Sequence, residues 1–398
     1  MRILHTSDWH IGKTVNEFSM LDDQEYFLDK MIETLISQKI DVLLISGDIY
    51  DRSVPPAPAV VLLNRTLQRI VEEIKIPVVA IAGNHDSPYR LDFGSGLFKK
   101  SGLFLEAVIK DEVEKVVLKD EYGDVNFYLL PFFDCYNIRS LFSDCDVKND
   151  NEAFSLVAKK FLENVDFSGR NVLLAHGYFE YLNGKEITNE VAAEFKENRF
   201  SEFDISLGSA ELIDISPVED FDYVALGHIH SPQKIKKNNI RYSGALLKYS
   251  KDEASQKRSL TIIDLKEKGN IEISSISIKP KRDMIIIKGD MATLLDKSSY
   301  TSDTDFNSYV FAVLTDEGVI FDAMNKLRSV FPNIMGISFE RFDAEKETVD
   351  GIEHSKNKKP IELFENFYRD ITDKEIDEEK KEIISRIFDD IAKEQREK

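Results

Sequence analysis

The first 82 residues alternate short apolar segments with longer amphipathic ones, and this alternation limits the possible fold more than any other feature. It predicts three buried strands and two helices, in the order 2–7, 21–38, 41–46, 57–74 and 77–82. This order implies a parallel sheet with helices packed on its faces. A polar cluster follows each strand, beginning at Ser7, Gly47 and Gly83. Parallel strands end at one edge of their sheet, so these clusters should lie together.

Four parts are predicted along the chain. Further strand patterns recur as far as residue 278, which defines a first domain over 1–279. The rest comprises an α+β capping domain over 280–345, a polar linker over 346–359 and a helical segment over 360–398. Within these parts, 177–219 is expected to be mostly loop and 319–330 to contain a helix.

The net charge limits the possible partners. The chain has 52 Lys and Arg residues against 72 Asp and Glu residues, giving −20. Such a charge repels nucleic-acid phosphates, so binding to DNA would need a local basic surface or a basic partner. Residues 234–258 hold eight basic and two acidic residues. They are either such a surface or, as we favour on charge alone, a strand edge covered by lysines.

Cysteine usage and hydropathy indicate a protein of the cytoplasm. Cys135 and Cys145 are too few for a disulfide framework. No apolar run approaches the roughly 18 residues that a membrane helix needs. We therefore expect a soluble cytoplasmic protein with no membrane partner.

Five clusters combine metal-ligating residue types with the ends of predicted strands, and they hold five of the seven histidines. Each cluster is weak evidence alone, but all five following apolar strands indicate a single site. The clusters are Asp8-Trp9-His10, Gly47-Asp48 with Asp51, Gly83-Asn84-His85-Asp86, Ala175-His176-Gly177 and Gly227-His228-Ile229-His230.

The residue types in these clusters predict the class of metal. Carboxylate, imidazole and amide groups without thiolates favour Mn²⁺, Fe²⁺ or Zn²⁺, and Mn²⁺ suits a mixed oxygen and nitrogen shell best. Six or seven such ligands exceed the needs of one ion. They indicate two metals bridged by a carboxylate, an arrangement that stabilises both oxygens of a phosphoryl displacement.

The order of these motifs resembles the calcineurin-like metallophosphoesterases. More narrowly, TSDWHIG, SGDIYDRSVPP, AGNHDS and ALGHIHSPQ are similar to the SbcD family, the nuclease subunits of bacterial SbcCD complexes. The narrower resemblance extends through Tyr242-Ser243-Gly244 to the C-terminal segment PIELFENFY. It implies an α/β (four-layer α+β) sandwich with a small α+β cap and a C-terminal helical tail that binds a partner.

The resemblance also assigns roles to residues. It implies that Asp48 bridges two divalent ions, which we expect to be Mn²⁺. His85 would face the scissile phosphate, with Asp86 orienting its imidazole. Asp51 stands where archaeal relatives carry a second phosphate-facing histidine, so no catalytic role is assigned to it. The metal ligands implied are Asp8, His10, Asp48 and His230 for one ion, and Asp48, Asn84, His176 and His228 for the other.

The same resemblance implies a DNA nuclease. It would act as an ATP-dependent 3′→5′ exonuclease on double-stranded ends and as an endonuclease on hairpins and single strands, in repair, recombination and replication. Two alternatives remain open. One is a small-molecule or nucleotide phosphodiesterase with the same metals, and the other is a non-catalytic subunit that tethers DNA.

The C-terminal tail is the implied partner site. Its apolar residues recur at helical spacing and would bind an SbcC-type ATPase related to the SMC proteins, within a complex containing two copies of each chain. Docking of the tail on its own domain is the alternative. The positions proposed for partner contact are Leu363, Phe364, Phe367, Tyr368, Ile384, Ile387 and Phe388.

Overall fold

The computed structural model describes residues 1–183, 212–302, 304–316, 318 and 320–340, with isolated positions between 361 and 388. The chain forms two compact units. One unit contains 1–312 and 321–337, and the other contains 313–320 and 338–398. The predicted domain boundaries remain predictions.

The first sheet is built from the predicted N-terminal strands. β1 (Arg2–Thr6), β4 (Val42–Ser46), β5 (Val78–Ile81) and β6 (Leu103–Glu106) run parallel in this order. β15 (Ser259–Leu265) pairs antiparallel with β1, and β16 (Ile271–Ser277) pairs antiparallel with β15. Apart from Arg2, β1, β4 and β5 are fully buried because both faces of this sheet are covered.

The second sheet repeats this plan. β8 (Gly123–Leu130), β9 (Arg170–His176), β12 (Tyr223–Gly227) and β14 (Ile240–Tyr242) are parallel neighbours. β7 (Glu114–Asp120) and β13 (Gln233–Lys234) pair antiparallel at the two edges. Both sheets therefore have a central parallel region whose strands end in loops on one edge.

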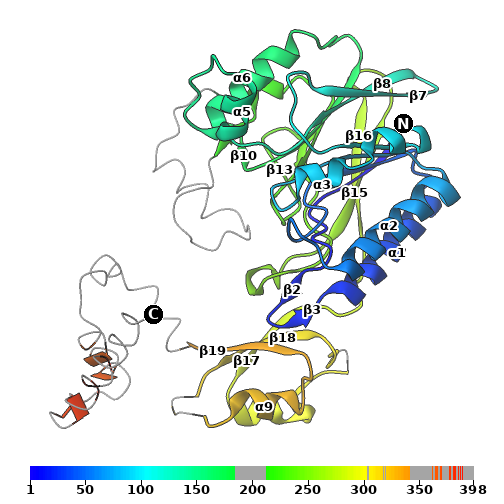
Figure 1. The fold of residues 1–398 in the computed structure, drawn as a ribbon. Coiled ribbons are helices and arrows are strands. Elements are labelled where there is room, and N and C mark those ends of the chain that lie inside the picture. The colour runs from blue at the N-terminus through cyan, green and yellow to red at the C-terminus, as the bar shows by residue number, and fades with distance from the viewer. Residues whose placement is uncertain are drawn as a thin grey trace. The chain divides into compact units, whose positions relative to one another are not determined.

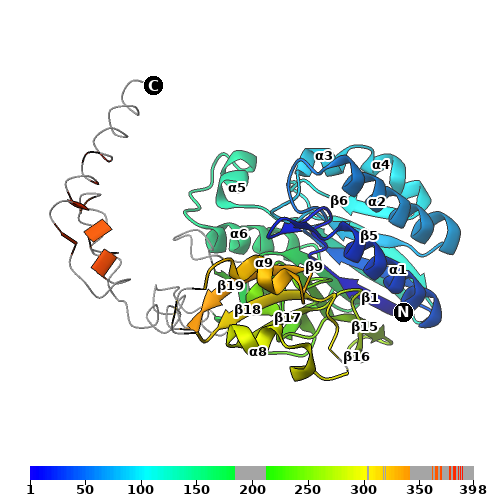
Figure 2. The ribbon, with the colours of Figure 1, turned by 90° about the horizontal axis from the view of Figure 1, so that it is seen from below.

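The two sheets pack face to face with helices outside, which confirms the expected four-layer architecture (Figures 1 and 2). Alternate residues such as Leu44 and Leu174 meet between the sheets. Helices α1 (Leu21–Ser37) and α2 (Ala57–Gln68) cover the outer face of the first sheet. Helices α5 (Cys135–Leu141) and α6 (Asp150–Leu162) cover the outer face of the second.

The chain after residue 280 forms a three-stranded sheet in the order β17 (Met284–Gly289), β18 (Tyr309–Leu314) and β19 (Ile334–Phe339). Its helices are α8 (Met291–Leu295) and α9 (Ala323–Arg328). The helix expected over 319–330 is shorter at both ends. It starts only after Asp322, whose φ of 56° lies in the left-handed region and interrupts a right-handed helix.

Two other predictions needed correction. The helix predicted over 57–74 changes after Gln68 into a π-helical turn, η1 (Arg69–Ile74). The described ends of the stretch expected to be loop carry a short strand pair, β10 (Phe179–Glu180) and β11 (Ile213–Asp214). Two-residue strands give no detectable period, which explains why the pattern missed them. Smaller elements elsewhere include the strand pair β2 (Thr14–Val15) and β3 (Phe18–Ser19), and the short helices α3 (Pro88–Asp92), α4 (Ser95–Phe98) and η4 (Lys251–Glu253).

Candidate metal centre

The end of β9 and the loops after β1, β4, β5 and β12 bring all seven predicted metal-ligand residues together. The two sheets come close at this edge, since a Cβ added to Gly227 would lie 1.8 Å from the carbonyl oxygen of Ser46. A Cβ at Gly83 would lie 2.1 Å from Asp48 Oδ1. Glycine at these two positions is what allows the ligand loops to approach one another.

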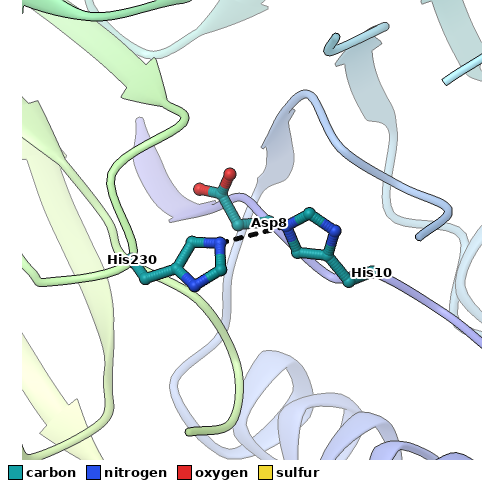
Figure 3. A group of neighbouring side chains, drawn as sticks. All are labelled: Asp8, His10 and His230. Atoms are coloured by element: carbon teal, nitrogen blue, oxygen red, sulfur yellow. Dashed lines mark hydrogen bonds between the residues drawn. The ribbon is translucent and has the colours of Figure 1, made fainter. Parts of the chain in front are cut away.

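The first group of ligand atoms comes from Asp8, His10 and His230, whose candidate donor atoms lie within 4.8 Å of one another. All three side chains are buried. The Nε2 atoms of His10 and His230 face each other at 3.1 Å (Figure 3). Asp48 Oδ2 lies 3.6 Å from His10 Nε2, so the carboxylate of Asp48 borders this group.

The second group comes from Asp48, His176 and His228, again within 4.8 Å. Asp48 Oδ2 lies 3.4 Å from His176 Nε2. The side-chain oxygen of Asn84 lies 3.0 Å from His176 Nε2 and 3.1 Å from His228 Nδ1. Asp48 therefore touches both groups through one oxygen, as a bridging carboxylate would.

The donor set fits divalent ions. Two ring nitrogens about 3 Å apart have the spacing of adjacent ligands that each lie about 2.1 Å from one ion. Carboxylate, imidazole and amide donors without sulfur suit hard to borderline metals. The backbone is strained at the same place, because φ is 53° at Asp8, 45° at His10, 50° at Asp48 and 108° at His228. Non-glycine residues hold such values where the surrounding structure over-determines them, typically at functional sites.

The protonation states in the metal-free protein suit cation binding at most positions. Burial lowers the pKa of His228 to about 3 and that of His10 well below its ordinary value, which leaves neutral imidazoles. Burial would raise the pKa of Asp48, but the neighbouring His176 and His10 hold it well below its ordinary value. Burial also disfavours charged His176, yet Asp48 raises the pKa of His176 to about 9. A metal would have to displace that proton.

The predicted role of Asp86 as a partner of His85 is wrong. The Nδ1 of His85 lies 2.8 Å from the backbone oxygen of Asp51. The carboxyl of Asp86 instead accepts the backbone N–H groups of Ile49, Tyr50 and Gly83 at 2.9–3.0 Å. A buried carboxyl satisfies unpaired amides of the adjoining turns first, so Asp86 joins the β4 and β5 loops. Burial raises the pKa of Asp86 to about 7.

Two residues that the sequence did not single out as functional hold the ligand loops. Buried Gln24 on α1 donates to the carbonyl oxygen of His10 at 2.7 Å and accepts the N–H of Gly12 at 3.0 Å. Buried Glu253 lies 3.1 Å from His230 Nδ1. The sequence does not reveal the role of Gln24, because a polar residue within an amphipathic helix is expected at the surface. Glu253 has only a weak signal in the sequence, as an acid within a basic stretch.

Three of the eight basic residues in the stretch 234–258 form ion pairs with acidic side chains of the described chain. Lys237 lies 2.9 Å from Glu219, Lys248 lies 2.8 Å from Asp283, and Arg258 contacts Glu253. These pairs favour the interpretation of this segment as a strand edge covered by lysines over that of a basic surface for DNA. His5 is also structural, because its buried ring hydrogen-bonds to Tyr223 and Ser46 in the core.

The tail residues are described only in part. Phe364, Tyr368, Ile384 and Phe388 are partly buried, while Leu363, Phe367 and Ile387 lie outside the described residues. The rings of Phe364 and Phe388 have centroids 6.4 Å apart, so these two positions of the predicted helical segment contact each other. No helix in the described parts of the chain has the length and apolar character to cross a membrane.

Comparison with known proteins agrees with this geometry. The model of the calcineurin-like phosphoesterase family matches residues 1–232, more than half of the chain. The chain belongs to the calcineurin-like phosphoesterases, and it is a metal-dependent phosphoester hydrolase. Two solved structures match at 13% identity: TT1561 of Thermus thermophilus, with a TM-score of 0.38 over 69% of this chain and 97% of that one, and YfcE, a phosphoesterase from E. coli, with a TM-score of 0.29 over 70% and 100%.

Full-length similarity narrows the assignment. The chain is 30% identical to the SbcD subunit of nuclease SbcCD from Staphylococcus epidermidis over 376 residues, which cover 94% of this chain and 95% of the relative. A second family model, described as the type 5 capsule protein repressor C-terminal domain and named SbcD_C, matches residues 280–372. Within the phosphoesterases, the chain belongs to the SbcD family.

Proposed function

We propose that this chain is the nuclease subunit of an SbcCD-type complex and hydrolyses DNA phosphodiesters with two divalent metal ions. The observation that carries the proposal is the pair of ligand groups that share Asp48. One ion would be held by Asp8, His10, Asp48 and His230. The other would be held by Asp48, Asn84, His176 and His228. The geometry suits Mn²⁺, the metal we propose, because it accepts mixed oxygen and nitrogen ligands.

The metals would supply Lewis-acid charge for the phosphate and a water of lowered pKa. The protein's part is to hold the ligands and place a proton donor. Since the Nδ1 of His85 is directed at the Asp51 carbonyl, its Nε2 is left to face a scissile phosphate. We assign His85 the transfer of a proton to the leaving oxygen. Asp86 keeps the His85 loop in place through backbone amides and acts as a positioning residue.

Family membership supports a proposal for the partner and the location. We propose that residues 360–398 bind an SbcC-type ATPase, which would also provide the positive DNA surface that a chain of charge −20 lacks. Phe364 and Phe388, already in contact, would belong to that interface. The complex would act in the cytoplasm on double-stranded ends and hairpins, with ATP-dependent 3′→5′ exonuclease activity.

A second copy of the chain is the proposed occupant of an apolar surface on α2, α3 and α4. Val61, Tyr89, Phe93 and Leu97 are 63–84% exposed beside a groove of about 720 Å³. Exposed apolar side chains gathered in one patch typically mark a site of protein–protein contact. Leu63, by contrast, is buried, so only one side of α2 belongs to this surface and the other side packs in the core. Tyr89→Ser should weaken the dimer and so lower the mean molar mass measured by light scattering. Tyr136→Ser, at an exposed aromatic residue on α5, should leave that mass unchanged.

The decisive experiment incubates the purified chain with Mn²⁺ and end-labelled duplex DNA, with and without an SbcC-type partner and ATP. Shortening of DNA that requires Mn²⁺ and increases with partner and ATP is expected. Fast hydrolysis of bis-p-nitrophenyl phosphate with intact DNA would indicate a small-molecule phosphodiesterase instead. DNA binding without any cleavage would indicate a tethering role.

A variant at His85 tests the mechanism within the same assay. His85→Gln should reduce cleavage by about 10²–10⁴-fold, the usual contribution of acid–base catalysis. Its binding of two Mn²⁺ ions should not change, because His85 is not among the proposed ligands. Cleavage at the wild-type rate would refute the role of His85 without affecting the metal assignment.

A further inference from the structure

A buried carboxylate outside the ligand set contacts one of the proposed ligands. Glu253, in the short helix η4 (Lys251–Glu253), is 2% exposed. Its Oε1 lies 3.1 Å from His230 Nδ1. Its Oε2 accepts the backbone N–H of Tyr249 at 3.0 Å and contacts the guanidinium of Arg258. Both oxygens are therefore engaged, and the carboxylate has little freedom to move.

This contact determines which nitrogen of His230 carries its proton. A neutral imidazole has one N–H and one lone pair. An ionised carboxylate only accepts hydrogen bonds, so the nitrogen facing Glu253, Nδ1, must be the protonated one. The lone pair then lies on Nε2, which faces His10 Nε2 at 3.1 Å in the first ligand group (Figure 3).

Arg258 also contacts the backbone of His230. Its guanidinium contacts both the carboxylate of Glu253 and the carbonyl oxygen of His230. That carbonyl also accepts the N–H of Ala245 at 3.0 Å. The pair Glu253–Arg258 therefore holds His230 at its ring and at its main chain together.

We infer that Glu253, fixed by Arg258, is a positioning residue that keeps His230 in the tautomer able to bind a metal through Nε2. This inference rests on the proposed two-metal function. A carboxylate partner also increases the basicity of the ligating nitrogen. His176 uses a neutral partner for the same purpose, since its Nδ1 lies 2.8 Å from the carbonyl oxygen of Ser46.

The first test needs no substitution. Nitrogen-15 NMR of the metal-free protein, with the signals of His230 and His176 assigned, reports which ring nitrogen is protonated. We expect protonated Nδ1 and unprotonated Nε2 at His230. A His230 ring protonated at Nε2 and unprotonated at Nδ1 would overturn the inference, whatever the protein's activity.

The second test measures metal binding. Glu253→Gln keeps the shape of the side chain, but its amide can donate to Nδ1 and so favour the other tautomer. Calorimetric titration with Mn²⁺ should show one of two sites weakened by about 10- to 100-fold, the usual effect of losing such a partner. The matched control is Glu106→Gln, which removes a buried carboxylate paired with Lys110 away from the ligands and should leave both affinities unchanged.

The outcomes separate this inference from the proposed function. If the wild-type chain binds no pair of Mn²⁺ ions, the two-metal proposal fails first. If His230→Ala loses one site while Glu253→Gln keeps both at wild-type affinity, the ligand assignment stands and the role of Glu253 is refuted. Should Glu253→Gln fail to fold, Arg258→Lys, which keeps the charge but not the planar two-point contact, should weaken the same site by a smaller factor.

Discussion

A buried ion pair joins the capping strands to the first helix, and its removal gives a sharp test of how the cap is held. Asp23 on α1 has a fully buried side chain that contacts the guanidinium of Arg282 and accepts the hydroxyl proton of Tyr309 at 2.8 Å. Tyr309 opens β18, and Arg282 precedes β17. These two contacts tie both strands to α1.

The burial of these side chains sets how much unfolding free energy each substitution should cost. Breaking a fully buried pair costs about 3–5 kcal/mol, because the remaining charge stays buried. The side chain of Arg282 is 25% exposed, so solvent would compensate part of this cost and we expect about 2–3 kcal/mol for Asp23→Asn. Tyr309→Phe removes one hydrogen bond to a charged acceptor and should cost about 1.5 kcal/mol. Asp22→Asn, at the exposed neighbouring acid, should stay within about 0.5 kcal/mol.

Hydrogen–deuterium exchange provides the assay. The N–H of Tyr309, bonded to the Asp283 carbonyl at 2.8 Å, reports opening of the cap strands. At 1.36 kcal/mol per factor of ten, Asp23→Asn should accelerate its exchange roughly 30- to 150-fold. Amides of β4 should keep their rates. Equal effects of Asp22→Asn and Asp23→Asn, or equal acceleration in β4, would refute the reasoning.

Three further outcomes are expected from single perturbations. Gly227→Ala should lower the melting temperature and the Mn²⁺ affinity together, because the added Cβ would lie 1.8 Å from the carbonyl oxygen of Ser46. A melting temperature and an affinity that calorimetry finds unchanged would contradict the close approach of the two sheets. Arg170 and the N-terminus hold the pKa of Asp120 below its ordinary value despite burial, so Asp120 stabilises the fold above its unfolded pKa of about 4 and loses this effect as the pH falls further. Asp120→Asn should accordingly destabilise the protein at pH 7 more than at pH 2, as measured by urea unfolding. Removal of metal by a chelator should lower the melting temperature. Added Mn²⁺ should raise the melting temperature again, in proportion to the logarithm of the Mn²⁺ concentration. A melting temperature independent of Mn²⁺ would argue against a metal site in the folded state.

The parts of the site that the sequence predicted are those set by strand order. Asp8, Asp48 and Asn84 each follow a buried apolar strand, and parallel pairing necessarily brings the ends of such strands to one edge. His176 and His228 belong to a second sheet. Their position after apolar strands indicated one site shared with the first three, but only the family resemblance implied which ion each would bind, since no local pattern reveals which face one sheet presents to another.

The parts that the sequence missed depend on tertiary backbone geometry. The family resemblance assigned Asp86 to orient His85, but a sequence motif does not show where unpaired amides lie. The amides of Ile49 and Tyr50 come from another loop and take the carboxyl of Asp86 instead. The left-handed conformations of Asp8 and His10 are likewise invisible in the sequence, since they result from bonds such as that between the N–H of His10 and the carbonyl oxygen of Asp48.

Two consecutive residues of α1 connect features that are far apart in the sequence. Asp23 contacts Arg282 and Tyr309 in the cap, and Gln24 binds the backbone around His10. Both side chains are fully buried, and both belong to one helix, whose hydrogen bonds make it move as a unit. The position of the cap and that of the first ligand loop are therefore set by the same turn of helix. A cap that shifted relative to α1 would break the Asp23 contacts before it disturbed Gln24, so the ligand loop is protected from small movements of the cap but not from displacement of the helix itself.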